Sequence, residues 1–166
     1  VADDITPYRE LKVRLLNASH SAFAYLGYLA GHEFIYQVAA QPEFVAFMRR
    51  FTADEVTPAL VAPPGIDLAE YRETLVRRFA NPALPHRTQQ IAMDGSQKLP
   101  QRLLGTVRDR IAAGASFRHL ALAIAGTIAA GTAHAQISDN VIKIGVLSDM
   151  SSLYTDLAGA GSVAAA

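Results

Sequence analysis

The 166-residue sequence contains no cysteine, which excludes disulfide bonds, thiolate metal sites and cysteine nucleophiles. It also lacks a surplus of charge of either sign, because 15 Lys and Arg residues balance 15 Asp and Glu residues. A neutral chain offers no electrostatic attraction to nucleic acid or to an anionic membrane, so we expect neither as a partner. The five histidines show no pair at the spacing of metal ligands, and no metal site is expected.

The composition that is present predicts a folded domain with a hydrophobic core, since 51% of the residues are apolar and only 18% are charged. The charges are distributed unevenly along the chain. Residues 1–126 carry 14 basic and 12 acidic side chains, whereas residues 127–166 carry one lysine and three aspartates. This shift in composition predicts two unlike pieces, a domain over residues 1–126 and an unrelated tail over residues 127–166.

Apolar residues recur at helical spacing through the first piece, and proline and glycine mark the breaks. Thr6-Pro7 is typical of a helix start with a hydroxyl cap, and Asp67 followed by Glu70 is typical of a capping box. Helices are predicted from Pro7 to near Gly27 or Gly31, and over residues 42–51, 67–79, 88–93, 100–113 and 116–124. A β-branched run at residues 141–147 predicts one short strand in the tail. The expected fold class is therefore mainly all-α.

Three polar side chains with complementary chemistry lie on the first predicted helix. At 100° per residue, His20 lies about 80° and Asn17 about 140° from Lys12 around the helix axis. Burial lowers the pKa of a lysine toward neutrality, which suits a general base that removes a hydroxyl proton. Asn17 and His20 can both hydrogen-bond to the reacting oxygen. The alternative is an amphipathic helix whose polar side chains face water without a catalytic role.

Two separated blocks of sequence resemble a known family. The first block is Thr6-Pro7-Tyr8, Lys12-x4-Asn17-x2-His20 and Tyr25-Leu26-Gly27, and the second is Asn81-Pro82, His86-Arg87-Thr88, Gln90-Ile91-Ala92, Asp94-Gly95-Ser96, Lys98 and Pro100-Gln101-Arg102. Over residues 1–126 the chain resembles the C-terminal helical domain of the polyol-specific long-chain dehydrogenases. These include mannitol 2-dehydrogenase and the fructuronate and tagaturonate reductases.

The resemblance implies oxidation of a secondary alcohol on a polyol or a sugar acid, with NAD or NADP as the cofactor. In this family the lysine of the first block is the general base, and its asparagine and histidine bind and polarise the reacting oxygen. Lys12, Asn17 and His20 match these three positions one by one. The resemblance therefore implies that they are the catalytic residues.

The second block resembles the substrate side of the family's site, which implies that Arg87, Asp94 and Lys98 bind substrate. Asp94-Gly95 is equally typical of a turn, and Arg87 of a surface cation. Gln89 stands where the family leads us to expect an aromatic residue, which weakens the predicted wall around the substrate.

The dinucleotide-binding (Rossmann) domain of the family has no counterpart in these 166 residues. Gly159-x-Gly161-x-x-Ala164 neither follows a strand directly nor opens a helix, so it is not a phosphate-binding fingerprint. We therefore expect a truncated domain that has no turnover when it is isolated. We expect the protein to be located in the cytoplasm.

The competing hypothesis is a non-catalytic helical packing module. An apolar stripe of Phe44, Phe47, Met48 and Phe51 is expected to line the core, and any part left exposed would promote self-association.

The tail resembles a different class of protein. The low-charge run over residues 120–135 ends in Ala133-His134-Ala135, a pattern typical of signal-peptide cleavage, and the segment from Ile142 resembles the mature start of periplasmic binding proteins for branched-chain amino acids. The chain would then be a chimera, and a periplasmic location would require translation to start near Arg118. The alternative that we favour is a hydrophobic helix over residues 120–135 that packs on the dehydrogenase-like helices. This run is shorter than the ~20 residues needed to span a bilayer.

Overall fold

In the computed structural model, which describes residues 4–133, the first helix runs unbroken from Thr6 to Leu29. It consists of α1 (Thr6–Glu10), the π-helical segment η1 (Leu11–Asn17) and α2 (Ala18–Leu29). The predicted hydroxyl cap at Thr6 is wrong, because the carboxylate of Asp4 accepts the Thr6 N–H at 2.8 Å. The helix thus starts one residue before the predicted first position at Pro7, and its end at Leu29 lies between the two predicted ends, Gly27 and Gly31.

The other described helices confirm the expected all-α class. They are α3 (Ile35–Ala39), α4 (Pro42–Arg50) with its π-helical continuation η2 (Phe51–Val56) and the 3-10 turn η3 (Thr57–Ala59), α5 (Leu68–Phe79), α6 (Thr88–Ala92), α7 (Gly95–Leu99) with its π-helical continuation η4 (Pro100–Leu104), α8 (Gly105–Ala112) and α9 (Arg118–Ala133). The helix predicted to start at Pro100 starts at Gly95, and α3 was not predicted. The predicted strand at residues 141–147 lies outside the described residues. None of the helices in the described part of the chain is long and apolar enough to cross a membrane.

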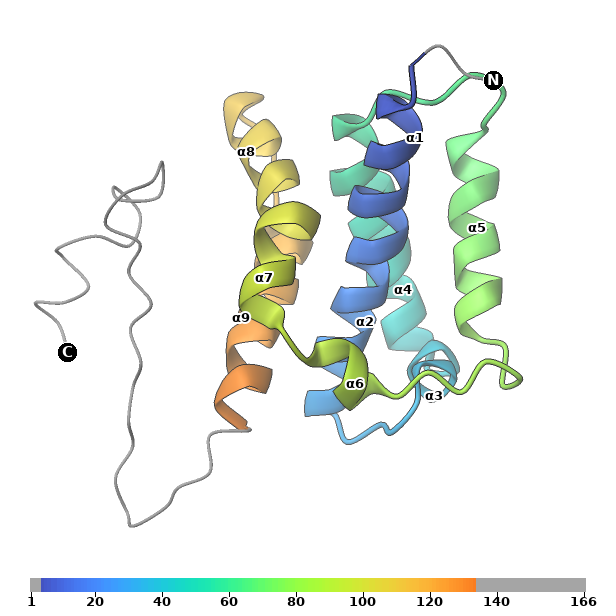
Figure 1. Cartoon of the computed structure of the whole chain (residues 1–166), viewed down its shortest axis with the longest axis vertical. Coiled ribbons are helices and arrows are strands. Elements are labelled where there is room, and N and C mark those ends of the chain that lie inside the picture. The colour runs from blue at the N-terminus through green and yellow to red at the C-terminus, as the bar shows by residue number, and fades with distance from the viewer. Residues whose placement is uncertain (1–3, 134–166) are drawn as a thin grey trace, which may run out of the picture. The chain divides into compact units, whose positions relative to one another are not determined.

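The long first helix lies in the middle of the bundle, with α5 on one side and α8 and α9 on the other (Figure 1). Its α2 portion packs against α6 and α9. At Gly27 an added Cβ atom would lie 2.2 Å from a methyl carbon of Val38, so only glycine allows α3 to approach α2 this closely. Gly31, with φ of +82°, then takes the left-handed conformation just beyond the helix end.

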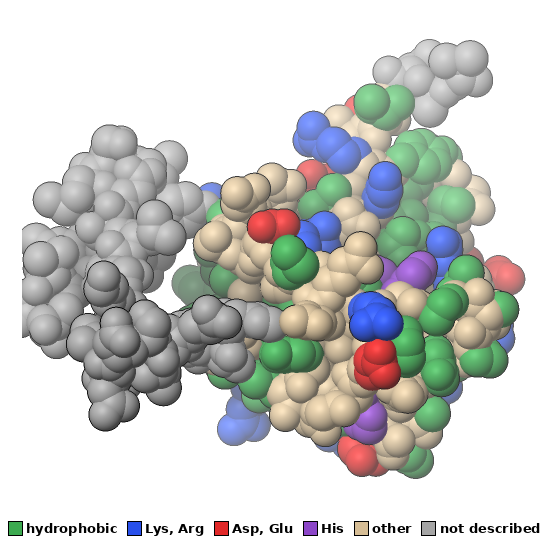
Figure 2. Space-filling view, turned by 60° about the horizontal axis from the view of Figure 1, so that its bottom comes forward, with side chains coloured by type: hydrophobic (Ala, Val, Ile, Leu, Met, Phe, Trp, Pro, Cys, Tyr) green, Lys and Arg blue, Asp and Glu red, His purple; other side chains and the backbone are tan. Residues whose placement is uncertain are grey.

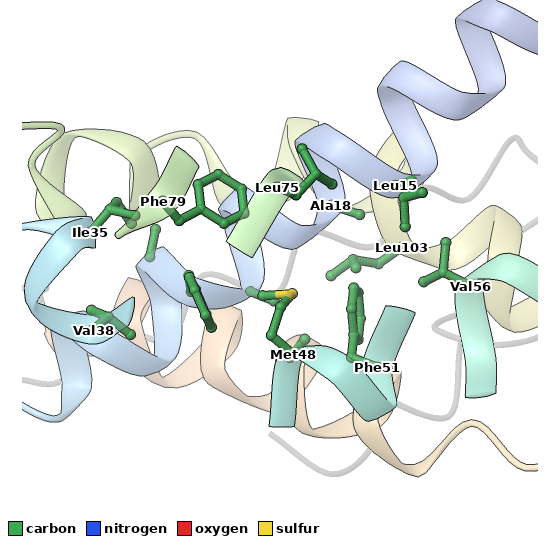
Figure 3. Close-up of a cluster of buried hydrophobic side chains, with 14 of the residues drawn as sticks. Leu15, Ala18, Ile35, Val38, Met48, Phe51, Val56, Leu75, Phe79 and Leu103 are labelled. Carbon is green, nitrogen blue, oxygen red and sulfur yellow. The ribbon is translucent and has the colours of Figure 1, made fainter. Parts of the chain in front are cut away.

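Figure 3 shows the hydrophobic core that these helices enclose. Leu15 and Phe51 are fully buried in it, and Met48 is 1% exposed. Phe44 and Phe47 are half-buried and pack against the same cluster. The predicted apolar stripe therefore lines the core.

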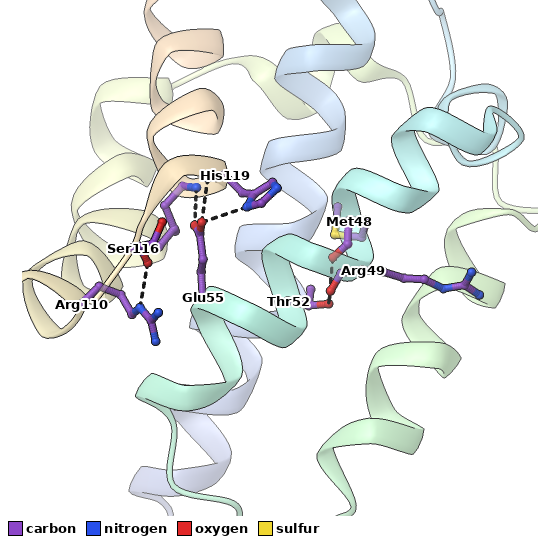
Figure 4. A network of polar contacts seen from close by, with 8 residues as sticks. Met48, Arg49, Thr52, Glu55, Arg110, Ser116 and His119 are labelled. Carbon is purple, nitrogen blue, oxygen red and sulfur yellow. Dashed lines mark hydrogen bonds and ion pairs between the residues drawn. The ribbon is translucent and has the colours of Figure 1, made fainter. Parts of the chain in front are cut away.

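The carboxylate of Glu55 fastens the start of α9 to η2 (Figure 4). One of its oxygens accepts the backbone N–H of His119 at 2.9 Å and the other accepts that of Leu120 at 2.8 Å, while His119 Nδ1 lies 2.9 Å from the first oxygen. The first N–H groups of a helix have no partner within it and carry partial positive charge, so a buried carboxylate stabilises them. The helix favoured for residues 120–135 is seen as α9 over its described part, with Leu120 and Ala123 buried.

Candidate active site

The π-helical segment changes how Lys12 and Asn17 relate around the first helix. In η1 the N–H of Ala18 donates to the carbonyl of Val13, five residues earlier. A π-helical turn contains more residues than an α-helical turn, so residues five apart lie closer to one face than the 140° that the α-helix predicts. Isolated π-helical turns occur frequently at functional sites.

His20 lies partly buried on the next turn, against aromatic rings. Its imidazole stacks on Phe79 with ring centroids 5.3 Å apart and an angle of 19° between the planes. The ring of His86 lies at the same centroid distance but is tilted by 52°. The Nε2 atom of His20 is buried and has no hydrogen-bond partner among the described residues.

Burial lowers the pKa of His20 from its ordinary value of 6.5 to about 4. Positive charge acts in the same direction, from His86, Arg102, Arg78 and Lys98 in that order. The imidazole is therefore neutral at neutral pH. A neutral imidazole has one N–H donor and one acceptor nitrogen, so its unpaired Nε2 can serve a substrate oxygen in either role.

Asn17 and His20 line one pocket of about 200 Å³. The first helix also contributes Leu16, and the other walls come from α3, from α5 and from the chain after α5: Ile35, Arg78, Phe79, Leu84 and His86. Figure 2 shows histidine and Lys or Arg side chains close together among hydrophobic ones on one face of the molecule. The pocket thus combines apolar walls with a few nitrogen donors, which is typical of small-molecule sites.

Lys12 does not line this pocket, and its side chain is exposed. The shelter that the sequence argument required for a lysine base is therefore not provided by the described residues. The first helix nevertheless carries Lys12, Asn17 and His20 without a break. The assignment of Lys12 as the base stays a prediction.

The structure separates the three residues predicted from the second block. Arg87 pairs with Glu33 at 3.3 Å, lies over the ring of Phe34 and borders another pocket, away from His20. Lys98 donates to the carbonyls of Ile91 and Met93, and its charge acts on His20. Burial and the charge of Arg102 lower the pKa of Lys98.

Asp94 occupies the turn between α6 and α7 in the left-handed conformation, with φ of 57°. Its carbonyl accepts the N–H groups of Gln97 and Lys98, and its side chain is exposed. The predicted turn is therefore present. A non-glycine residue with positive φ costs backbone energy and occurs preferentially at functional sites.

Arg102, Arg78 and His86 complete the surroundings of His20 and were not predicted as site residues. Arg102 donates to the hydroxyl of Ser21 at 2.8 Å and to the backbone carbonyl of Asn17 at 3.5 Å. Arg102 and His86 belong to the second block, so the sequence contained a signal for both. Arg78 carried no such signal, because only the fold brings α5 beside the first helix.

Comparison with known proteins shows the family to which the chain belongs. Residues 4–144 match the sequence model of the family described as the mannitol dehydrogenase C-terminal domain. This chain belongs to the mannitol dehydrogenase family. The mannitol dehydrogenase match extends past residue 133 into the part of the chain that the structure does not describe, so the predicted boundary at residue 126 stays a prediction.

The relatives of this mannitol dehydrogenase domain are oxidoreductases. It is 50% identical over 123 residues to D-mannonate oxidoreductase of Escherichia coli (strain K12). The aligned segment covers 74% of this chain and 25% of that protein. It is 40% identical over 121 residues to mannitol 2-dehydrogenase of Phaeosphaeria nodorum, covering 73% of this chain and 21% of that protein. The chain therefore spans about a quarter of the length of the curated relatives it matches.

A solved structure agrees with the mannitol dehydrogenase fold. Mannitol 2-dehydrogenase of Pseudomonas fluorescens, in a ternary complex with NAD and D-mannitol, superposes with a TM-score of 0.77 at 37% identity. The superposition covers 90% of this chain and 30% of that one. The resemblance inferred from the two sequence blocks is thereby confirmed.

Residues 4–133 do not form a dinucleotide site of the Rossmann type. Rossmann folds hold the pyrophosphate at a glycine-rich turn between a strand and a helix, and residues 4–133 form no strand. Within the same described range, no group of three or more His, Asp or Glu side chains could hold a metal ion.

Proposed function

We propose that this domain forms the substrate side of an NAD- or NADP-dependent dehydrogenase that oxidises a secondary alcohol on a polyol or a sugar acid. The observation that carries the proposal is the shared pocket of Asn17 and His20, with the buried Nε2 of His20 free of protein partners. Membership of the mannitol dehydrogenase family supports the reaction class. The pocket, at about 200 Å³, is smaller than the ~300–1,000 Å³ usual for ligand sites, which suits one wall of a larger site.

In this proposal each polar residue acts on the reacting hydroxyl group. Asn17 donates its amide N–H to the oxygen, and the neutral imidazole of His20 makes a second hydrogen bond to it. Lys12 in its neutral form takes the hydroxyl proton as the carbon–oxygen double bond forms. The hydride leaves to a nicotinamide cofactor that we place outside residues 4–133.

Lys12 can perform this role only where it is sheltered from water. Its exposed side chain lies on the same helix as the pocket, on a surface that the remainder of a longer relative could cover. Such cover would exclude water from the amine, as a lysine that acts as general base requires. The exposure of Lys12 equally suits the competing hypothesis of a packing module without catalysis, so the test must separate the two.

A hybrid protein tests the proposal. Residues 4–126 replace the similar segment of Escherichia coli D-mannonate oxidoreductase, and NADH absorbance is followed with D-mannonate as substrate. We expect turnover by the hybrid and none by residues 1–166 alone, since these residues hold no dinucleotide site of the Rossmann type in their described part. A folded hybrid without turnover would favour the packing module, and turnover by the isolated chain would contradict the proposal as stated.

A further inference from the structure

Three cations, Arg102, Arg78 and Lys98, act on the pKa of His20, together with the imidazole of His86. No Asp or Glu lines the pocket that His20 shares with Asn17. A pocket that is lined by charges of one sign focuses their electrostatic potential, and it attracts small ions of the opposite charge.

Two of these cations are already engaged by the protein. Arg102 donates to Ser21 and to the Asn17 carbonyl, and Lys98 donates to two backbone carbonyls at the end of α6. Arg102 thus bonds to the first helix and Lys98 to the end of α6. Both side chains are therefore less free than Arg78 to bind a ligand.

Arg78 is different, because its guanidinium has no hydrogen bond or ion pair with any other described residue. Arg14, Arg49 and Arg87, by contrast, each face a carboxylate. Arg78 also lines the His20 pocket. A guanidinium that borders a pocket without a partner has all five N–H donors available to an incoming acceptor.

His86 lines the same pocket as Arg78, and its backbone is held by hydrogen bonds. Its carbonyl accepts the N–H of Ile35 at 2.9 Å, and its own N–H donates to the carbonyl of Leu84 at 2.8 Å. The ring is exposed and lies next to that of His20. It can thus add one more nitrogen donor without rearrangement of the backbone.

We propose that Arg78, assisted by His86, binds the carboxylate of a sugar-acid substrate and so selects an anionic sugar over a neutral polyol. The inference rests on the proposed function and specifies its substrate class. The carboxylate would lie at the Arg78 side of the pocket, and the hydroxyl carbon at the side of Asn17 and His20. A planar guanidinium forms two parallel hydrogen bonds with a carboxylate, whereas a neutral polyol leaves the cations uncompensated.

A titration of the full chain tests the inference. We would follow the side-chain amide of Asn17 and the ring of His20 by NMR as D-mannonate, D-mannitol or acetate is added. D-mannonate is expected to bind at least about tenfold more tightly than D-mannitol, since a hydrogen bond to a charged group contributes about that factor. Acetate, which lacks the hydroxyl groups, is expected to bind more weakly than D-mannonate.

The variants R78Q and R77Q separate a role of Arg78 from a general charge effect. Arg77 is the adjacent exposed arginine on α5 and donates to Thr74, outside the pocket. R78Q should lose the preference for D-mannonate, because it weakens D-mannonate binding far more than D-mannitol binding, whereas R77Q should behave like the unaltered protein. Backbone NMR spectra of both variants show whether the fold is kept.

The outcomes distinguish the two proposals. If D-mannonate and D-mannitol bind equally, or if R78Q and R77Q behave alike, Arg78 does not select the substrate, and the proposed function stands. If acetate binds as tightly as D-mannonate, the pocket is an adventitious anion site only, and the inference is overturned. If neither sugar shifts the signals of Asn17 and His20, the proposed function fails, and the inference that rests on it fails too.

Discussion

His20 combines a hydrophobic setting with a surrounding group of cations. Stacking on Phe79 removes water from the ring, and the nearby positive charges further oppose its protonation. Both effects keep the imidazole neutral, which leaves Nε2 able to hydrogen-bond a substrate oxygen without adding a charge to the site. The electrostatics of this residue also affect the stability of the fold.

Acidification should therefore destabilise the domain through His20. Its pKa is about 4 in the fold and near 6.5 in the unfolded chain, so between these values the unfolded chain binds more protons. The free energy of unfolding should fall as the pH drops from about 6.5 to 4, by about 3 kcal/mol from this residue alone. Urea denaturation at several pH values measures the fall. H20Q should remove most of it and H32Q should retain it; an equal fall in H20Q would show that other groups cause it.

Among the elements, α9 depends on a contact that is distant in sequence. The sequence predicts a helix start at residue 116, but α9 begins at Arg118, and Glu55 in η2 accepts its first N–H groups. The side chain of Glu55 is 3% exposed, so water does not compete for these hydrogen bonds. The attachment of α9 therefore rests on one buried carboxylate.

E55Q should destabilise the domain by about 1–3 kcal/mol, because the amide has one acceptor oxygen where the carboxylate had two. E73Q is the matched control, since Glu73 makes an exposed ion pair with Arg49 at 2.9 Å, and its loss should cost less than about 1 kcal/mol. Urea unfolding of the two variants gives the comparison. Equal losses in E55Q and E73Q would mean that Glu55 does not fasten α9.

The elements also show what periodicity in the sequence could predict. Periodicity predicted the first helix and α5. The residue pattern at Asp67 predicted the cap of α5, and its carboxylate accepts the N–H groups of Ala69 and Glu70. Periodicity could not predict the π-helical segments, because their extra residue per turn leaves no mark in a 3.6-residue pattern. Pro100 was mistaken for a helix start, although it lies within a continuous helix at the junction of α7 and η4.

At the scale of the whole molecule, contacts between distant segments assemble the pocket. Asn17 and His20 follow from the sequence motif, but Arg78 comes from α5 and His86 from the chain after it. Such contacts leave no local pattern, which is why Arg78 was missed. The same dependence on distant contacts explains Arg87, which matches the second block and yet pairs with Glu33 outside the pocket.

Lys12 is the point at which the motif and the described structure differ most, because the motif predicts a sheltered base and the side chain is exposed. The central claim is that this helix performs acid–base catalysis in a complete dehydrogenase. The most direct measurement is kcat of the hybrid enzyme with K12A, and with R9A as an exposed cation on the same helix for control. We predict that K12A lowers kcat by about 10²–10⁴-fold while R9A leaves it unchanged. A K12A hybrid with the kcat of R9A would contradict the account.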